Sequence, residues 1–162
     1  MKLVTIGVYG SDETAFFGAL QRVRVDTFCD IRRRRGLRGS EYAFANSARL
    51  QKRLHELGIR YLHVPEVAPS DKLRAAQAKA DAAEHIARRK RSVLSDTFTQ
   101  GYRRECLAHF DSRKFVERFG REAKVVALFC VEREPAACHR SLLAERLKHD
   151  LGIKVEHIIP GH

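Results

Sequence analysis

Long apolar runs are missing from this sequence of 162 residues. No stretch approaches the ~20 apolar residues that a membrane-spanning helix needs. The first residues, MKLVTIGVYGSDE, reach acidic side chains too early for the apolar region of a secretory signal. We therefore expect a soluble globular protein in the cytoplasm, with no membrane partner.

Cysteine is sparse, and its spacing argues against two classes of small protein. Cys29, Cys106, Cys130 and Cys138 form no CxxC pair and no dense framework, so neither a zinc ribbon nor a disulfide scaffold is indicated. The sequence also has no Walker loop, no GxGxxG string and no serine nucleophile elbow. ATPase, dinucleotide and serine-hydrolase chemistry are therefore not expected.

Acidic residues are too few to balance the basic ones, since 31 Lys+Arg against 20 Asp+Glu leave a net charge of +11. Such a charge attracts polyanions and phosphorylated ligands. It is concentrated in RRRR at residues 32–35, with Arg38 just beyond, and in RRKR at residues 88–91. These blocks are either an anion-binding face or a solvated basic surface. We expect weak binding of nucleic acid or another polyanion, without sequence specificity.

Five short β-branched or aromatic runs predict strands, and helical patterns separate them. The runs cover residues 3–8, 25–31, 59–64, 125–131 and 153–159. Start signals at Ser11-Asp12, Asn46, Ser70-Asp71, Ser95-Asp96, Ser112 and Pro135 predict the helices. The alanine-rich segment 71–91 predicts one long, partly exposed helix. The alternation predicts a single α/β domain over residues 1–162, with three α/β/α layers around a mainly parallel sheet of about five strands.

Polar residues stand where three of the predicted strands end. Asp30 and Arg32 close the second, His63 closes the third, and Glu132 follows the fourth. Ligands of open parallel sheets bind beyond the carboxyl ends of the strands. A single polar residue there is more often a structural cap, but several at one edge point to a common pocket.

The segment CVEREPAACHR, residues 130–140, carries the sharpest local signal. Pro135 favours a first helical turn, which places Cys138, His139 and Arg140 at a helix N-terminus. The helix dipole and the neighbouring basic residues would lower the pKa of a thiol at that point. Cys138 is therefore a candidate nucleophile.

Two other interpretations of Cys138 remain open. In the first, the thiol packs in the core while Arg140 forms a salt bridge with Glu132 or Asp30. In the second, a metal ion is bound by donors chosen from Cys138, His139, His63 and Glu132. Their spacing matches no metal motif, so no metal ligand is predicted, and the sequence leaves the cofactor undetermined. The cysteines on the presumed buried strands, Cys29 and Cys130, are expected to be core residues.

Several strings carry a family resemblance. They are Thr5-Ile6-Gly7, Asp30-Ile31-Arg32, the stretch Ser40 to Phe44, Gly58-Ile59-x-Tyr61-x-His63, Phe129-Cys130-x-Glu132-x-x-Pro135-x-x-Cys138-His139-Arg140 and the late His157-Ile158. Over nearly its whole length the chain resembles the DUF488 family. That family usually has His-Ser where Val8-Tyr9 stands here, and a proline that this arginine-rich loop lacks. The resemblance implies a shared α/β fold and a shared polar cluster, without a known reaction.

Two functions fit these patterns. The first is an enzyme that acts on a nucleotide, a nucleic acid or another phosphate-bearing ligand at the carboxyl edge of the sheet. Its candidate catalytic residues are Cys138, His139, Glu132, Asp30 and His63. Its candidate anion-binding residues are Arg32, Arg33, Arg34, Arg35 and Arg140. The alternative is a non-catalytic, basic nucleic-acid-binding or protein-interaction module.

Overall fold

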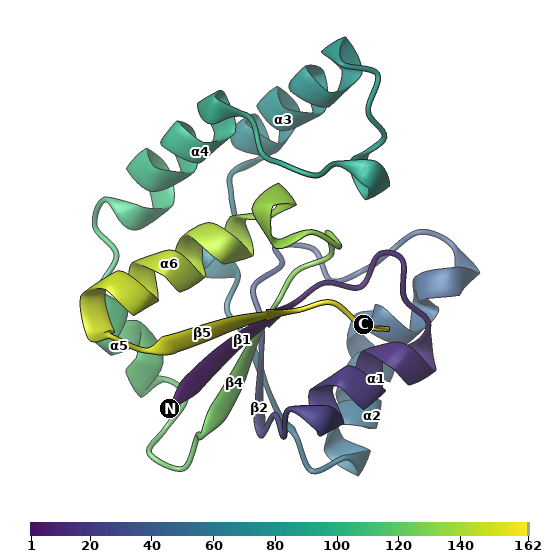
Figure 1. Ribbon diagram of the computed structural model, residues 1–162, viewed down its shortest axis with the longest axis vertical. Helices are drawn as coiled ribbons and strands as arrows, with labels where there is room; N and C mark the ends of the chain where they lie inside the picture. The colour runs from purple at the N-terminus through teal and green to yellow at the C-terminus, as the bar shows by residue number, and fades with distance from the viewer. Residues whose placement is uncertain (162) are drawn as a thin grey trace.

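A computed structural model describes residues 1–161, and at its centre is a five-stranded sheet in which every strand pair is parallel (Figure 1). The strands are β1 (Lys2–Ile6), β2 (Thr27–Asp30), β3 (Arg60–His63), β4 (Val125–Phe129) and β5 (Lys154–Ile158). Their spatial order is β3-β2-β4-β1-β5. Each strand overlaps one of the five predicted runs, and the predicted α/β fold around a mainly parallel sheet is confirmed.

Helices cover both faces of this sheet (Figure 1). One face carries α1 (Glu13–Arg22) and α2 (Ser47–Glu56). The other carries α6 (His139–Leu151), with α5 (Ser112–Glu117) beside it. Outside α6 lie α3 (Asp71–Ala83) and α4 (Asp96–Tyr102), which pack on each other. Within residues 1–161, no helix has the length and apolar character needed to cross a membrane.

Short irregular helices connect these elements. Four 3-10 helices cover Ser40–Ala45, Pro65–Val67, Arg88–Lys90 and Pro135–Ala137, and a π-helical turn covers Arg103–Leu107. The predicted start signals of α1, α3 and α4 include residues that form N-caps. The side chains of Asp12, Ser70 and Ser95 each accept the backbone N–H three residues further on.

The alanine-rich segment does not form one helix through residue 91. The α3 helix ends at Ala83, and the chain reverses at His85, whose φ is 56°. Arg91 then returns to α3 and pairs with Asp81 at 2.8 Å. In a continuous helix these two residues would lie about 15 Å apart along the axis. Pairing with a buried carboxylate therefore overrides the helix propensity of the segment, and the basic block at residues 88–91 is brought back over the sheet edge.

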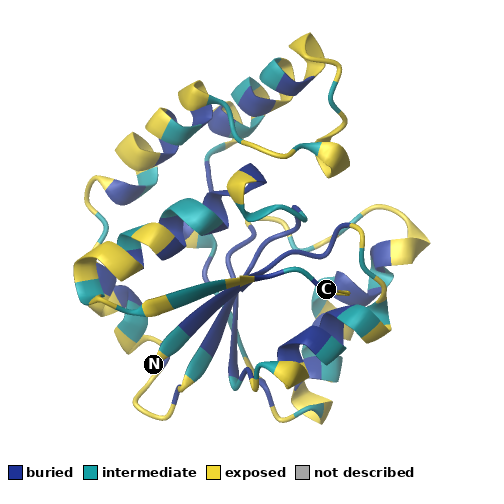
Figure 2. Ribbon diagram, in the orientation of Figure 1, coloured by how far each residue is buried: buried dark blue, intermediate teal, exposed yellow. Residues whose placement is uncertain are grey.

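The inner strands are buried on both faces, as the dark β1, β2 and β4 in Figure 2 show. Phe129 of β4 packs against Phe28 of β2 and Phe16 of α1, with ring centroids 5.1 and 5.5 Å apart. Cys29, the next residue of β2, is also fully buried, in the core position that the sequence predicts. Burial raises the pKa of its thiol, so Cys29 remains a protonated core residue.

The neighbouring strands β1 and β4 send their connections to opposite faces of the sheet. The chain leaves β1 towards α1 and leaves β4 towards α6 (Figure 1). Ligands of open α/β sheets bind at such a switch point. The two loops are joined here, because the N–H groups of Val8 and Tyr9 both donate to the carbonyl of Val131, at 3.1 and 3.0 Å.

Candidate functional site

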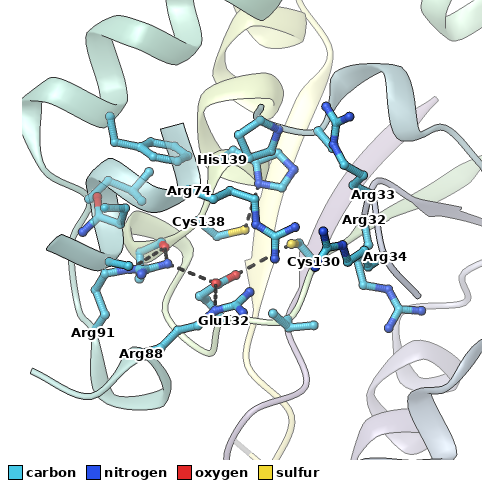
Figure 3. A pocket seen from close by; sticks show the side chains of 18 of the residues that line it. Arg32, Arg33, Arg34, Arg74, Arg88, Arg91, Cys130, Glu132, Cys138 and His139 are labelled. Atoms are coloured by element: carbon cyan, nitrogen blue, oxygen red, sulfur yellow. Dashed lines mark hydrogen bonds and ion pairs between the residues drawn. The ribbon is translucent and has the colours of Figure 1, made fainter. Parts of the chain in front are cut away.

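A cavity of about 660 Å³ lies at this carboxyl edge. Its wall is built by residues 32–34 and 36–38 after β2, residues 130–132 after β4, residues 137–139 at the start of α6, one face of α3, and the segment 88–94. Figure 3 shows the sulfurs of Cys130 and Cys138 and the imidazole of His139 between the arginines of these segments. Eight arginines and three carboxylate residues line the cavity, so its field attracts anions.

The predicted site residues divide into two groups. Those that line the cavity are Arg32, Arg33, Arg34, Glu132, Cys138 and His139. Those that are described by the structure but contribute nothing to the lining are Asp30, His63, Arg35 and Arg140. The predicted residues therefore gather at one edge of the sheet, where some of them line the cavity and the others support its wall.

Asp30 and Arg32 form a buried ion pair beneath the cavity wall. The Arg32 Nε and Nη2 groups donate to the two carboxylate oxygens of Asp30 at 2.9 and 2.8 Å. The Tyr61 hydroxyl donates to the same carboxylate at 2.7 Å, and the Arg32 guanidinium lies 4.7 Å from the Phe129 ring centroid. The charge of Arg32 is thus balanced by protein, and the pair fixes the start of the arginine-rich loop.

His63 also supports this loop. Its Nε2 lies 2.7 Å from the carbonyl oxygen of Arg32. Arg35 lies close to the same strand, because its guanidinium donates to the Tyr61 hydroxyl at 3.4 Å. These contacts tie the loop to β3 and turn both side chains away from the cavity.

Arg140 is fully buried and pairs with neither of the carboxylates named as its alternative partners. Its Nη1 donates to the carbonyl of Glu132 at 2.6 Å, and its Nη2 donates to the carbonyl of Arg133 at 3.1 Å. Arg140 therefore holds the backbone of the loop after β4. The carboxylate of Glu132 instead accepts from Arg91 at 3.0 Å and from Arg88 at 3.3 Å.

Cys138 is the N-cap of α6, where its Sγ accepts the N–H of Arg140 at 3.5 Å. Its Sγ also lies 3.7 Å from His139 Nδ1, and one ligand atom each of Cys130, Cys138 and His139 lie within 4.8 Å of one another. Burial opposes ionisation of Cys138. A hydrogen bond from Cys130 and the neighbouring His139 and Arg140 nevertheless hold the pKa of Cys138 well below its usual range.

Cys130 shows the opposite shift. Its hydrogen bond to Cys138 and its burial raise the pKa of the Cys130 thiol well above its usual value. The opposite shifts favour the proton on Cys130 and the thiolate form of Cys138. Burial and the nearby Cys138 also raise the pKa of Glu132.

We expect iodoacetamide to label Cys138 faster than Cys106 in protein freed of metal by a chelator. The Cys138 rate should fall less steeply than the Cys106 rate as the pH is lowered from about 8 to 6, because the pKa of Cys138 is lowered. Burial and the charge of Glu105 raise the pKa of Cys106, so its rate should fall about tenfold for each pH unit removed. Mass-spectrometric mapping at each pH measures both sites. If the alkylation rate of Cys138 changed with pH as steeply as that of Cys106, the lowered pKa of Cys138 would be contradicted.

Some cavity residues were not found from the sequence. Cys130 is buried as expected for a core residue, but its sulfur also contacts the Cys138–His139 pair. Arg74 of α3 enters the lining with no sequence signal, because only tertiary packing places α3 over the sheet edge. The segments 32–38 and 88–91, which the sequence left unplaced relative to each other, line the same cavity.

Comparison with known proteins gives one match. The model of a family described as domain of unknown function DUF488 matches residues 13–147, which include every lining residue from Arg32 to His139. No curated protein and no solved structure matches the chain. The family match agrees with the resemblance of the sequence strings, and the chain belongs to the DUF488 family.

Proposed function

We propose that this protein is an enzyme that binds a phosphate-bearing small molecule of nucleotide size and acts on it through Cys138 and His139. The observation that carries the proposal is the Cys138 thiol at the start of α6, in the wall of a cavity rich in arginine, where its neighbours lower its pKa. The volume of about 660 Å³ suits a ligand of this size. Tyr9, Leu37 and Phe98 add apolar surface that a base can contact.

Four lining arginines are available for an anion. The guanidinium groups of Arg33, Arg34, Arg38 and Arg74 make no hydrogen bond or ion pair with any part of the chain that the structure describes. Guanidinium groups bind phosphate oxygens through charge-assisted hydrogen bonds, which are stronger than neutral ones. These side chains are therefore the first candidates to hold the phosphate.

The loop that carries three of these arginines is anchored at its base. The Leu37 N–H donates to Asn46 Oδ1 at 2.6 Å, and the Ser47 N–H donates to the carbonyl of Arg35 at 3.1 Å. Arg33, Arg34 and Arg38 are exposed on this anchored loop. A bound anion would therefore need to order side chains only, which keeps the entropic cost of binding low.

The opposite wall is held by carboxylates. Arg91 is fixed by Asp81 and Glu132, and it also donates to the carbonyl of Ala137 at 3.1 Å. Gln77 donates to Asp81 at 2.8 Å and accepts the N–H of Ser95 at 2.9 Å, which ties α3 to the start of α4. These contacts make the wall rigid. The phosphate would bind between this wall and the loop, with the reactive end of the ligand directed to Cys138.

We expect replacement of Arg33 and Arg34 by glutamine to weaken the binding of ADP, used as the probe, by about tenfold or more. Isothermal titration calorimetry measures the affinity. The matched control is Arg104→Gln with Arg121→Gln, two exposed arginines outside the cavity lining, which lowers the net charge equally. An equal loss in both double variants would mean that only the overall charge matters, and the proposed site would be wrong.

Binding of a single-stranded oligonucleotide distinguishes the proposed enzyme from a non-catalytic nucleic-acid-binding module. Phosphate-dominated binding of a polymer weakens steeply as salt rises from about 50 to 200 mM. Tight, salt-sensitive oligonucleotide binding without ADP binding would favour the non-catalytic nucleic-acid-binding module and overturn the proposal.

If a phosphate compound is consumed, Cys138→Ser should abolish its turnover and leave its binding within about twofold.

A further inference from the structure

We propose that Cys130, Cys138 and His139 bind one divalent metal ion of the zinc class, with one coordination position open to the cavity. All three side chains are buried, and one ligand atom from each lies within 4.8 Å of the other two. Two sulfurs and an imidazole nitrogen are donors that Zn²⁺ prefers. Three protein ligands with a free fourth position are typical of reactive rather than purely structural zinc sites.

The backbone holds the three donors in fixed places. Cys130 directly follows β4, Cys138 caps α6, and His139 is the first residue of α6. Arg140 ties the loop between the two cysteines through its bonds to the carbonyls of Glu132 and Arg133. The donors therefore need only small side-chain shifts to close on an ion, and binding requires little ordering of the chain.

The imidazole nitrogens of His139 are not fully satisfied by hydrogen bonds. Its Nε2 is buried and has no hydrogen-bond partner among the described residues, and its Nδ1 lies 3.7 Å from the sulfur of Cys138. Burying an imidazole without satisfying its nitrogens is unfavourable, and such groups in native proteins call for an explanation. A metal ion bound by this ring and the two sulfurs supplies one.

The paired thiols also favour a cation. Two buried thiolates this close together would repel each other unless a cation lies between them. A divalent ion neutralises both sulfurs, and its binding releases to solvent whatever thiol protons they carry. No other bond changes in this step, and the two thiolates balance the two charges of the ion.

The open position of such an ion would face the arginine-lined cavity, since all three ligands line it. Glu132 stands beside the three donors, with Oε1 held by Arg88 and Arg91 and Oε2 3.7 Å from the Cys130 sulfur. Its carboxylate is placed to accept a proton from water at the open position. That a phosphate oxygen binds at this position rests on the function proposed above, whereas metal binding does not.

Cobalt(II) alone, added to the metal-free full-length protein, tests the site. We expect one ion per chain and an intense sulfur-to-cobalt charge-transfer band in the near ultraviolet, with the visible bands of tetrahedral coordination. Cys130→Ser, Cys138→Ser and His139→Gln should each weaken binding by about tenfold or more. Cys106→Ser is the matched control, because this thiol lies outside the cavity lining, and it should leave the band unchanged.

A second measurement needs no variant. One equivalent of zinc added to the wild-type protein should slow alkylation of Cys138 by about tenfold or more and leave the Cys106 rate unchanged. Absence of a thiolate band with one equivalent of cobalt, or an unchanged affinity and band in both Cys130→Ser and Cys138→Ser, would overturn the metal site. ADP binding to the metal-free protein tests the proposed function separately. The Arg33→Gln, Arg34→Gln variant should keep a normal cobalt band, so a failure of ADP binding can be told apart from a failure of metal binding.

Discussion

Replacement of Asp30 by asparagine should lower the free energy of unfolding by about 3–5 kcal/mol, because it leaves the charge of Arg32 buried without a counter-charge. The side chains of Asp30 and Arg32 are 0% and 3% exposed. The Asp30 carboxylate accepts the Arg32 N–H and guanidinium and the Tyr61 hydroxyl. An amide has a single oxygen to replace these two acceptors, so some of the donors would lose their partner. Urea unfolding followed by circular dichroism measures the loss.

Two controls accompany this variant. Glu13→Gln breaks an ion pair with Arg49 whose side chains are both more than a third exposed, and it should cost at most about 1 kcal/mol. Combining Asp30→Asn with Arg32→Met removes the buried cation as well and should recover much of the loss. If Asp30→Asn lowered the free energy of unfolding as little as Glu13→Gln does, the buried pair would not stabilise the sheet edge.

Alanine at Gly7 should destabilise the protein by about 3 kcal/mol, the upper end of the usual cost of overpacking. A Cβ at this position would lie 1.8 Å from the carbonyl oxygen of Glu132 and 3.3 Å from Arg140 Nη1. Neither can move freely, because Arg140 holds that same carbonyl. Relief of the clash requires the loops after β1 and β4 to separate, which would displace Cys130 and Glu132 from the cavity.

Thermal and urea unfolding measure this effect, and Gly18→Ala is its matched control. Gly18 lies inside α1, and a Cβ there meets nothing within 4 Å. Alanine in the helix should therefore stabilise the protein by about 0.5–1 kcal/mol. The Gly7→Ala variant should also lose the cobalt band if it folds. Opposite signs for the two substitutions are the expected result, and a neutral Gly7→Ala would mean that the two loops are not in tight contact.

The sequence determined the strands, the starts of several helices and the edge of the sheet at which the candidate residues gather. Alternating β-branched runs and capped helices are local patterns, so the strands and the starts of α1, α3 and α4 follow from them. Parallel strands bring their carboxyl ends to one edge, which placed Arg32 and Glu132 near each other. The position of Cys138 at the start of α6 was also predictable, because Pro135 marks the turn that precedes the helix.

Only the tertiary structure decided which side chains line the cavity and which partners they choose. His63 ends β3 at the edge of the sheet, beyond β2, and the order of strands in space does not follow their order in the chain. Arg140 binds carbonyls rather than carboxylates, and Arg91 interrupts a predicted helix to reach Asp81. Cys130 meets Cys138 because α6 returns across the end of β4. Local propensity is a property of neighbouring residues, whereas each of these contacts depends on how segments far apart in the chain pack together.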